Sequence, residues 1–178
     1  TNLSIFDNPL LSACDIPNIC DYLSSPNGVV EIRNNATGCN NPPEIAEKCG
    51  FTMPCLPYGN YYFDCQTDID NFQINYPNCT EMGGGIWIGD EDGTDITNLN
   101  GLDVITSIDG FLSIGDVELY WGYYIFYFNP LLTDLSGLSE LTYIGGSLSI
   151  VKNDALTSLT GLEGVTSIGG DLYIGNNA

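Results

Sequence analysis

Residues 145–168 read GGSLSIVKNDALTSLTGLEGVTSI, and residues 169–178 start the same pattern again as GGDLYIGNNA. Leu148 and Leu172 hold the same place in the two copies and are 24 residues apart. The unit is GGxLxIxxNxxLTxLxGLxx[LIV]TxI, and its length lies within the range of leucine-rich repeats. Two earlier segments share its second half, ITNLNGLDVITSI at 96–108 and LTDLSGLSELTYI at 132–144.

The repeat predicts a structure of stacked coils. The L-x-I alternation makes a short strand that turns two apolar side chains to the same face. Asparagine and glycine suit the turns, because they tolerate the backbone conformations that tight turns need. One coil cannot bury its own apolar face, so coils must stack. We therefore expect a mostly β leucine-rich-repeat solenoid with short parallel strands, disulfide-stapled caps and a few short helices, in which Leu112, Leu148 and Leu172 lie on adjacent strands. A two-sheet sandwich with coincidental spacing is the alternative.

One copy of the repeat carries a long insertion. Leu112 and Leu148 are 36 residues apart, and the extra residues fall within 115–128, GDVELYWGYYIFYF. Tyrosine and tryptophan combine a large apolar area with a polar group, so this segment is a candidate surface for a sugar or a protein. The alternative is a hairpin that folds back over the solenoid flank and builds a small core of its own. The candidate contact residues are Tyr120, Trp121, Tyr123, Tyr124, Phe126, Tyr127 and Phe128.

The seven cysteines all lie in the first half of the chain, and the whole chain has no histidine. Without histidine or paired C-x-x-C spacing, a zinc site is poorly supported, and disulfides in an oxidising compartment fit better. We therefore expect an extracellular or cell-surface location. Cys55 is expected to pair with Cys79, which leaves Cys65 free or paired between chains. Four further cysteines allow three pairings, among which the sequence does not choose: Cys14, Cys20, Cys39 and Cys49.

The first residues also fit the repeat, because Leu3 matches Leu148 and Asn8 matches Asn153. Residues 1–50 are thus expected to hold the last repeat strand and the cysteine-rich C-terminal cap of one solenoid, with short helices at 17–23 and 41–48. Residues 51–66 are predicted to be a linker. Residues 67–178 are expected to form an N-terminal cap helix, opened by a capping box at 67–70, and the start of a second solenoid.

This order leaves an apolar strand edge at residues 172–174, which favours association. We expect Leu3 and Ile5 to stack on Leu172 and Ile174. The contact is either head-to-tail self-association of neighbouring chains or continuation of the same chain as a longer tandem array. A fragment cut by proteolysis is the alternative.

The charge balance excludes several classes of function. Asp and Glu number 23 against 3 Lys and Arg, for a formal net charge of −20. Nucleic acids and anionic membranes both require clustered cations, so neither is an expected partner. No apolar run is long enough to insert into a membrane. The sequence has no histidine for a nucleophile–base pair and no phosphate-binding loop, so we expect no enzymatic activity and no organic cofactor.

Two further patterns have both a functional and a structural reading. Residues 90–95, DEDGTD, gather carboxylates on a glycine-containing turn, which makes Asp90, Asp92 and Asp95 candidate Ca²⁺ ligands, although the spacing is not that of an EF-hand. A solvated acidic turn is the alternative. Threonines recur at two repeat positions, and we expect their hydroxyls to bond between coils rather than to bind ice. These threonines are Thr97, Thr133, Thr157, Thr106, Thr142 and Thr166.

The segments NPLLSACDIPNICDYL at 8–23 and NATGCNNPPEI at 35–45, together with the repeats, resemble secreted bacterial leucine-rich-repeat surface proteins of the receptor L-domain type. The likeness covers about residues 1–50 and 67–178. It implies an exported protein associated with adhesion or the cell surface, and it brings no catalytic residue. We therefore expect a structural or adhesive unit of a filament or long array. The alternative is a recognition module that binds a glycan or a protein through the aromatic insertion and the solenoid face.

Overall fold

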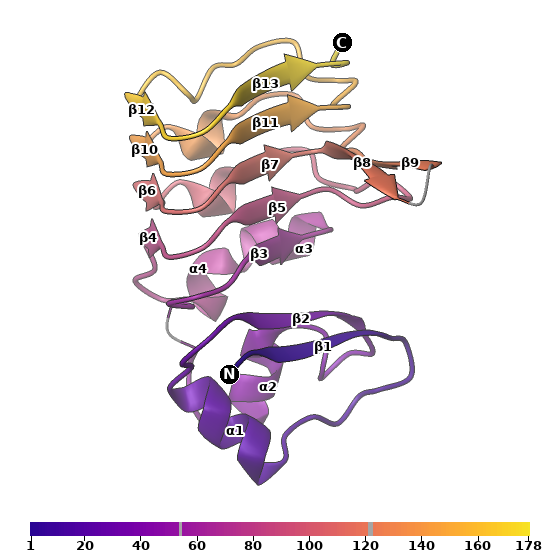
Figure 1. Cartoon of the computed structure of the whole chain (residues 1–178), viewed down its shortest axis with the longest axis vertical. Coiled ribbons are helices and arrows are strands. Elements are labelled where there is room, and N and C mark those ends of the chain that lie inside the picture. Colours follow the sequence, from indigo (N-terminus) through magenta and orange to yellow (C-terminus); the bar gives the residue numbers. More distant parts are fainter. Residues whose placement is uncertain (54, 121–122) are drawn as a thin grey trace.

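The computed structural model describes residues 1–53, 55–120 and 123–178 (Figure 1). It is strand-rich, with 27% strand and 17% helix. Two parallel sheets run beside each other along the long axis of the molecule, and a smaller group of elements lies at one end (Figure 1). The expected short parallel strands and short helices are thus confirmed.

Each regular copy of the repeat gives one strand to each parallel sheet. The five-stranded sheet consists of β3 (Tyr61–Phe63), β5 (Ile86–Ile88), β7 (Leu112–Ile114), β11 (Leu148–Val151) and β13 (Leu172–Gly175). The four-stranded sheet consists of β4 (Glu81–Met82), β6 (Ser107–Ile108), β10 (Tyr143–Ile144) and β12 (Ser167–Ile168). Short 3-10 turns follow the L-T-x-L segments, as η1 (Asn100–Leu102) and η2 (Ser136–Leu138).

The register of the five-stranded sheet follows the sequence repeat. Leu148 pairs with Leu112 on one side and with Leu172 on the other, so the predicted adjacency of these residues is confirmed. Equivalent positions of successive copies therefore lie side by side, and their apolar side chains fill one continuous core. Ile88, Ile114 and Ile150 are all fully buried in it. Neighbouring copies approach so closely that a side chain at Gly137 would collide with the carbonyl oxygen of Leu99.

A row of asparagine side chains connects the copies inside this core. Asn129 Nδ2 donates to Asn153 Oδ1 at 3.0 Å, and Asn153 Nδ2 donates to Asn177 Oδ1 at 3.1 Å. Asn129 and Asn153 are fully buried, and each also donates to a strand carbonyl, that of Ile88 for Asn129 and that of Ile114 for Asn153. The repeated asparagine thus adds side-chain hydrogen bonds between neighbouring copies inside the core.

The group of elements at the other end comprises residues 1–50, called here the N-terminal unit (Figure 1). Asn41 Oδ1 accepts a hydrogen bond from Glu44 N at 3.0 Å, which caps the second helix as its sequence predicts. The pairing of the first four cysteines, which the sequence left open, joins Cys14 to Cys39 and Cys20 to Cys49. The elements of the unit are β1 (Leu3–Asn8), α1 (Pro17–Ser24), β2 (Val30–Asn35) and α2 (Pro42–Lys48), with β1 parallel to β2.

The segment between the two parts holds more than the predicted linker. Residues 61–63 form β3, which pairs in register with β5 and so belongs to the five-stranded sheet. Two short helices follow, α3 (Gln66–Asp70) and α4 (Phe72–Asn75). The capping box predicted at 67–70 is wrong, because α3 starts one residue earlier and its Gln66 N donates to Asp95 Oδ1 at 2.7 Å.

The third disulfide closes this cap region. Cys55 pairs with Cys79, as predicted, and Cys65 has no disulfide partner among the described residues. Three intrachain disulfides indicate an oxidising environment. No helix in the described ranges combines the length and the apolar character that crossing a membrane requires.

Candidate interaction surfaces

The aromatic insertion forms an antiparallel hairpin of β8 (Asp116–Tyr120) and β9 (Tyr123–Tyr127) beside the five-stranded sheet (Figure 1). On one face of β9, Tyr124 and Phe126 are 65% and 42% exposed, and their ring centroids lie 6.3 Å apart. Lys152 Nζ lies 5.1 Å from the Phe126 ring. Tyr123, at the turn, is exposed as well. The hairpin thus presents aromatic rings to solvent.

The other residues of the insertion contribute differently. Tyr127 faces the sheet, where its ring packs edge-on against Trp87 at 5.6 Å. Phe128 is half-buried and its backbone N donates to Asp90 O at 3.1 Å. Trp121 lies outside the described residues, and Tyr120 is described only through its backbone pairing with Tyr123. The predicted contact residues therefore divide between an exposed face and an anchoring face.

A crevice opens where the hairpin, the five-stranded sheet and the N-terminal unit meet. Its volume is about 430 Å³, and residues of all three parts line it. Two outward-facing side chains of the sheet, Tyr62 on β3 and Trp87 on β5, stack in it with ring centroids 6.4 Å apart. The Nε1 atom of Trp87 is buried and has no hydrogen-bond partner within the described part of the chain, so packing holds the indole in place.

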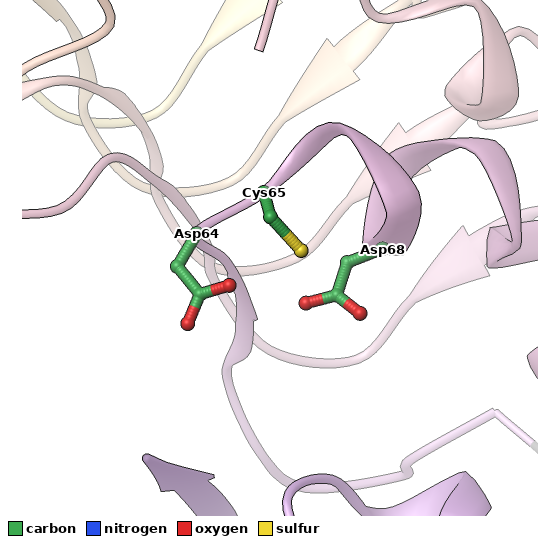
Figure 2. A group of neighbouring side chains, drawn as sticks. All are labelled: Asp64, Cys65 and Asp68. Carbon is green, nitrogen blue, oxygen red and sulfur yellow. The ribbon is translucent and has the colours of Figure 1, made fainter. Parts of the chain in front are cut away.

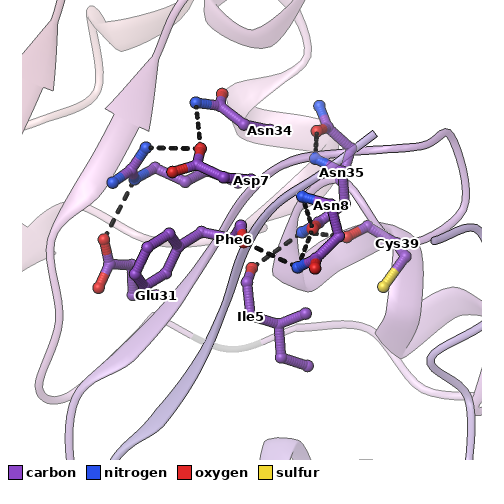
Figure 3. A network of polar contacts seen from close by, with 10 residues as sticks. Ile5, Phe6, Asp7, Asn8, Glu31, Asn34, Asn35 and Cys39 are labelled. Atoms are coloured by element: carbon purple, nitrogen blue, oxygen red, sulfur yellow. Dashed lines mark hydrogen bonds and ion pairs between the residues drawn. The ribbon is translucent and has the colours of Figure 1, made fainter. Parts of the chain in front are cut away.

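Arg33 of β2 forms one wall of the crevice and is held by both charge and aromatic faces. Its guanidinium lies 3.5 Å from a carboxylate oxygen of Asp7 and 3.1 Å from one of Glu31. The guanidinium carbon also lies 4.9 Å from the Phe6 ring centroid and 5.2 Å from that of Tyr62. Figure 3 shows the Asp7, Glu31 and Phe6 side chains of this network. The contact with Tyr62 joins the N-terminal unit to the sheet.

Three side chains gather at the point where β3 leads into α3 (Figure 2). Ligand atoms of Asp64, Cys65 and Asp68 lie within 4.8 Å of one another. Burial, and next the negative charge of Asp64, raises the pKa of Asp68 to about 6. Burial, and next the charge of Asp68, raises the pKa of the Cys65 thiol to about 12. At neutral pH Cys65 is therefore a protonated thiol, a poor nucleophile and a poor metal ligand.

The acidic turn at 90–95 does not gather its carboxylates in the way a calcium site requires. Asp90 Oδ1 accepts a hydrogen bond from Asp92 N at 2.9 Å within the turn. Asp95 Oδ1 instead accepts from Gln66 N at 2.7 Å, at the start of α3. Among the described residues, the group whose ligand atoms converge is the one at Asp64, not the one predicted here. Asp90 and Asp95 therefore accept hydrogen bonds from backbone N–H groups and do not converge on a common cation position.

Four of the six repeated threonines donate a hydrogen bond to the preceding coil, as predicted, whereas Thr97 Oγ1 donates to Gln66 Oε1 at 3.1 Å. Thr142 Oγ1 donates to Thr106 O at 3.0 Å, and Thr166 Oγ1 donates to Thr142 O at 3.1 Å. In the other row, Thr133 Oγ1 donates to Thr97 O at 3.4 Å. These hydroxyls are therefore engaged in joining copies.

The last strand exposes residues whose repeat equivalents are buried. Leu172 and Ile174 of β13 are 59% and 45% exposed, whereas Leu148 and Ile150, one copy earlier, are 3% and 0% exposed. At the other end of the molecule, Leu3 and Ile5 of β1 are partly buried against β2. The predicted apolar edge is thus present on β13.

No protein-family model, no curated protein and no solved structure matches this chain. The sequence reasoning missed the crevice, because Tyr62, Trp87 and Arg33 come from three distant segments. One signal for Trp87 was available: it holds the outward middle position of I-W-I, where the regular copies carry serine or tyrosine.

Proposed function

We propose that the chain is a leucine-rich-repeat solenoid that serves as a non-enzymatic, extracellular structural or adhesive protein, in which repeat coils stack head to tail into a long array. The register of the strands and the shared apolar core support the solenoid. The three disulfides support an oxidising location. The N-terminal unit, residues 1–50, lies at one end of the molecule, which is consistent with a C-terminal cap of one solenoid that is followed by the start of another. Chains of this kind act through their surfaces rather than through a catalytic centre.

One observation carries this proposal: the contrast between β13 and its own repeat equivalent. Leu172 is 59% exposed and Leu148 is 3% exposed, although both occupy the leucine position of L-x-I. The difference arises because a further strand covers β11 and none in the described chain covers β13. An apolar parallel edge of this kind is complemented best by another strand of the same pattern.

The first strand offers that pattern. Leu3 and Ile5 repeat the L-x-I spacing, and Asn8 follows at the same distance as Asn153. Asn8 N and Nδ2 donate to Asn35 Oδ1 (Figure 3). Asn153 N and Nδ2 donate to Asn177 Oδ1 in the same way. A covering coil that pairs its leucine with Leu172 and its asparagine with Asn177 continues both the strand pairing of the five-stranded sheet and the row of asparagine side chains. The coil belongs either to a neighbouring chain or to a continuation of the same chain.

The test uses the intact native protein and the double variant Leu172→Asp/Ile174→Asp. If a neighbouring chain covers β13, sedimentation velocity and electron microscopy show assemblies whose length falls in the variant. If the same chain covers it, the variant instead lowers the stability of a single long particle. Tyr143→Asp, at a similarly exposed apolar residue on the side of the molecule, is the control and changes neither. Dispersed particles with no response to either variant contradict the proposal.

The second candidate is a recognition module, which the exposed face of the hairpin favours. Tyr124 and Phe126 present two neighbouring rings to solvent, a surface suited to stacking on a sugar or on a protein side chain. Glycan-array and pull-down screens with Tyr124→Ser/Phe126→Ser test it. Leu131→Ser removes a comparably exposed apolar side chain outside the hairpin and serves as the control. Screens that find no ligand, or a ligand that both variants bind equally, count against this candidate.

A further inference from the structure

The strands β1 and β13 each have one edge without a partner strand. Within the described part of the chain, β1 pairs only with β2, and β13 pairs only with β11. β13 lies at one end of the molecule, and β1 belongs to the N-terminal unit at the other end (Figure 1). The two open edges therefore differ in sequence and belong to opposite ends, so any contact between them joins two different surfaces.

The backbone groups on the two open edges are in phase. In a parallel sheet the N–H and C=O of one residue point to one neighbouring strand, and those of the next residue point to the other. Leu148 N donates to the carbonyl before Leu172, and Leu3 N donates to the carbonyl before Val30. Leu172 therefore points its own N–H and C=O away from β11, and Ser4 points its own away from β2. A β1 strand laid parallel on β13 meets it as β13 meets β11.

The asparagine row leaves one donor and one acceptor unused, and they lie on these same two strands. In the later copies, the asparagine Nδ2 donates to the isoleucine carbonyl of the preceding strand. Asn8 makes no such bond within the described residues, and the carbonyl of Ile174 accepts none there. The leftover donor on the β1 side thus matches the leftover acceptor on β13. The bonds that are made join Asn35 to Ile5 at 2.8 Å, Asn129 to Ile88 at 3.1 Å, Asn153 to Ile114 at 2.9 Å and Asn177 to Ile150 at 2.9 Å.

A second bond of the row is unmade at the same two ends. Asn153 N donates to Asn177 Oδ1 at 3.1 Å, and Asn8 N donates to Asn35 Oδ1 at 3.1 Å. Among the described residues, Asn177 N has no acceptor and Asn8 Oδ1 has no donor. If Asn8 lay beside Asn177, both groups would gain the partner that their equivalents have inside the stack. Each end therefore offers the polar groups that the other end lacks.

The coil that follows β1 also exposes an apolar side chain that other copies bury. Leu11 holds the place of Leu156, three residues after the asparagine. Leu11 N donates to Asn8 O at 2.9 Å, and Leu156 N donates to Asn153 O at 3.0 Å, so the two turns share a conformation. Leu11 is nevertheless 38% exposed, whereas Leu156 is 4% exposed. Covering this coil as well as β13 buries apolar surface at both ends, which favours their contact.

We propose that a second copy of this chain covers β13 with its own β1, in parallel and in register, so that Leu3 pairs with Leu172 and Asn8 pairs with Asn177. This inference rests on the proposed function and assigns its covering coil to a neighbouring chain. Because the two edges differ and belong to opposite ends, the contact leaves one edge of each kind open in every assembly. The chains therefore add head to tail without forming a symmetric pair.

The test blocks one edge at a time in the intact protein. Ser4→Pro removes the outward N–H of β1 and keeps its pairing with β2, and Ser4→Ala, which retains that N–H, is the matched control. Leu172→Asp/Ile174→Asp blocks β13. Sedimentation velocity is expected to show open-ended assemblies for the wild type and Ser4→Ala, and association at least about tenfold weaker for either blocked chain. An equimolar mixture of the two blocked chains is expected to form pairs and nothing larger, because one free edge of each kind remains.

A cross-link reads the register without the proline variant. The proposed register places Ser4 opposite Tyr173, on the side of Tyr173 away from Ser149, its partner within the chain. Paired residues of neighbouring strands lie about 4.8 Å apart, which suits a disulfide. Ser4→Cys and Tyr173→Cys chains, both carrying Cys65→Ala, are mixed and oxidised, and a disulfide-linked pair of chains is expected. Ser4→Cys mixed with Tyr143→Cys, at an exposed residue on the side of the molecule, is the control and gives no such pair.

Pairs in the mixture of blocked chains and a cross-link between positions 4 and 173 support the proposal. If Leu172→Asp/Ile174→Asp destabilises a single particle and Ser4→Pro changes neither its mass nor its stability, the same chain covers β13. The proposed function then stands and the second copy is ruled out. Dimers that persist in Ser4→Pro show β13 pairing with β13 and also overturn the proposal, as does an equal yield of cross-link with the control chain.

Discussion

The side-chain amide of Asn153 makes hydrogen bonds to the copies of the repeat on both sides of its own. Its Nδ2 donates to Ile114 O at 2.9 Å and to Asn177 Oδ1 at 3.1 Å, and its Oδ1 accepts from Asn129 Nδ2 at 3.0 Å. The residue is fully buried. The sequence indicated a turn asparagine at this position, but it did not reveal the ladder, because the partners lie in other copies of the repeat.

Replacing Asn153 is expected to destabilise the whole fold. Asn153→Ala removes the hydrogen bonds that Asn153 makes inside the core with Asn129, with the Ile114 carbonyl and with Asn177, so the free energy of unfolding falls by about 2–4 kcal/mol. Asn18→Ala, at an exposed position of α1, is the control and changes it by less than about 0.5 kcal/mol. Urea unfolding of the two variants measures both values. A loss for Asn153→Ala no larger than that of the control contradicts a structural ladder.

The Asp68 carboxyl makes stability depend on pH. Its pKa in the folded protein is about 6, raised from 3.8. Between these two values the folded state holds a proton that the unfolded state has lost, so the stabilisation from this group is complete below about pH 4 and is lost as the pH rises through about 6. Asp68→Asn is therefore expected to melt at a higher temperature than the wild type near pH 8, and at the same temperature near pH 4.

Thermal unfolding followed by circular dichroism at the two pH values checks this prediction. Asp109→Asn, at an exposed carboxylate that does not line the crevice, controls for the general relief of negative charge. If both variants gain equally near pH 8, the effect belongs to the overall net charge and not to the Asp64–Asp68 pair.

At the scale of elements, the sequence predicted those features that depend on neighbouring residues, such as a helix cap. The start of α2 was predicted because Asn41 caps it and prolines occupy its first turn. The cap of α3 was mispredicted, since its acceptor is Asp95, far along the chain. Strand β3 was missed because it gains its partners only by pairing with β5. Cys20–Cys49 joins α1 to the end of α2, and Cys14–Cys39 joins the segments that precede the two helices. No spacing rule reveals this pairing.

The Cys55–Cys79 disulfide is expected to contribute more to the stability of the fold than the Cys65 thiol does. Cys55 and Cys79 are 24 residues apart, and removing the bond with Cys55→Ala/Cys79→Ala lowers the free energy of unfolding by about 3 kcal/mol. Cys65→Ala removes a thiol without a disulfide partner and has a much smaller effect. Denaturant titration compares the three proteins. Equal losses in the two variants would argue against a stabilising role for the bond.

At the scale of the whole molecule, the repeat predicted the order of the strands that its own copies supply. Each copy supplies a leucine and an isoleucine that need a covered face, and parallel pairing at a fixed period covers every copy but the last. The crevice was not predictable in this way, because the N-terminal unit, the hairpin and the sheet each contribute part of it. What repeats in the sequence was predictable, and what depends on contacts between non-repeated segments was not.

The proposed array requires that each copy of the repeat forms one coil of a stack. Deletion of one copy tests this requirement most directly. Removing residues 145–168 joins Ile144 to Gly169, a junction that the sequence already contains in equivalent form, and lets Leu172 pair with Leu112. Removing residues 145–156 deletes half a period and breaks the register. Near-UV circular dichroism and urea unfolding then compare the two proteins. We predict native spectra and cooperative unfolding for the full-period deletion alone. Equal damage in both proteins, or a native fold after the half-period deletion, contradicts the stacked repeat.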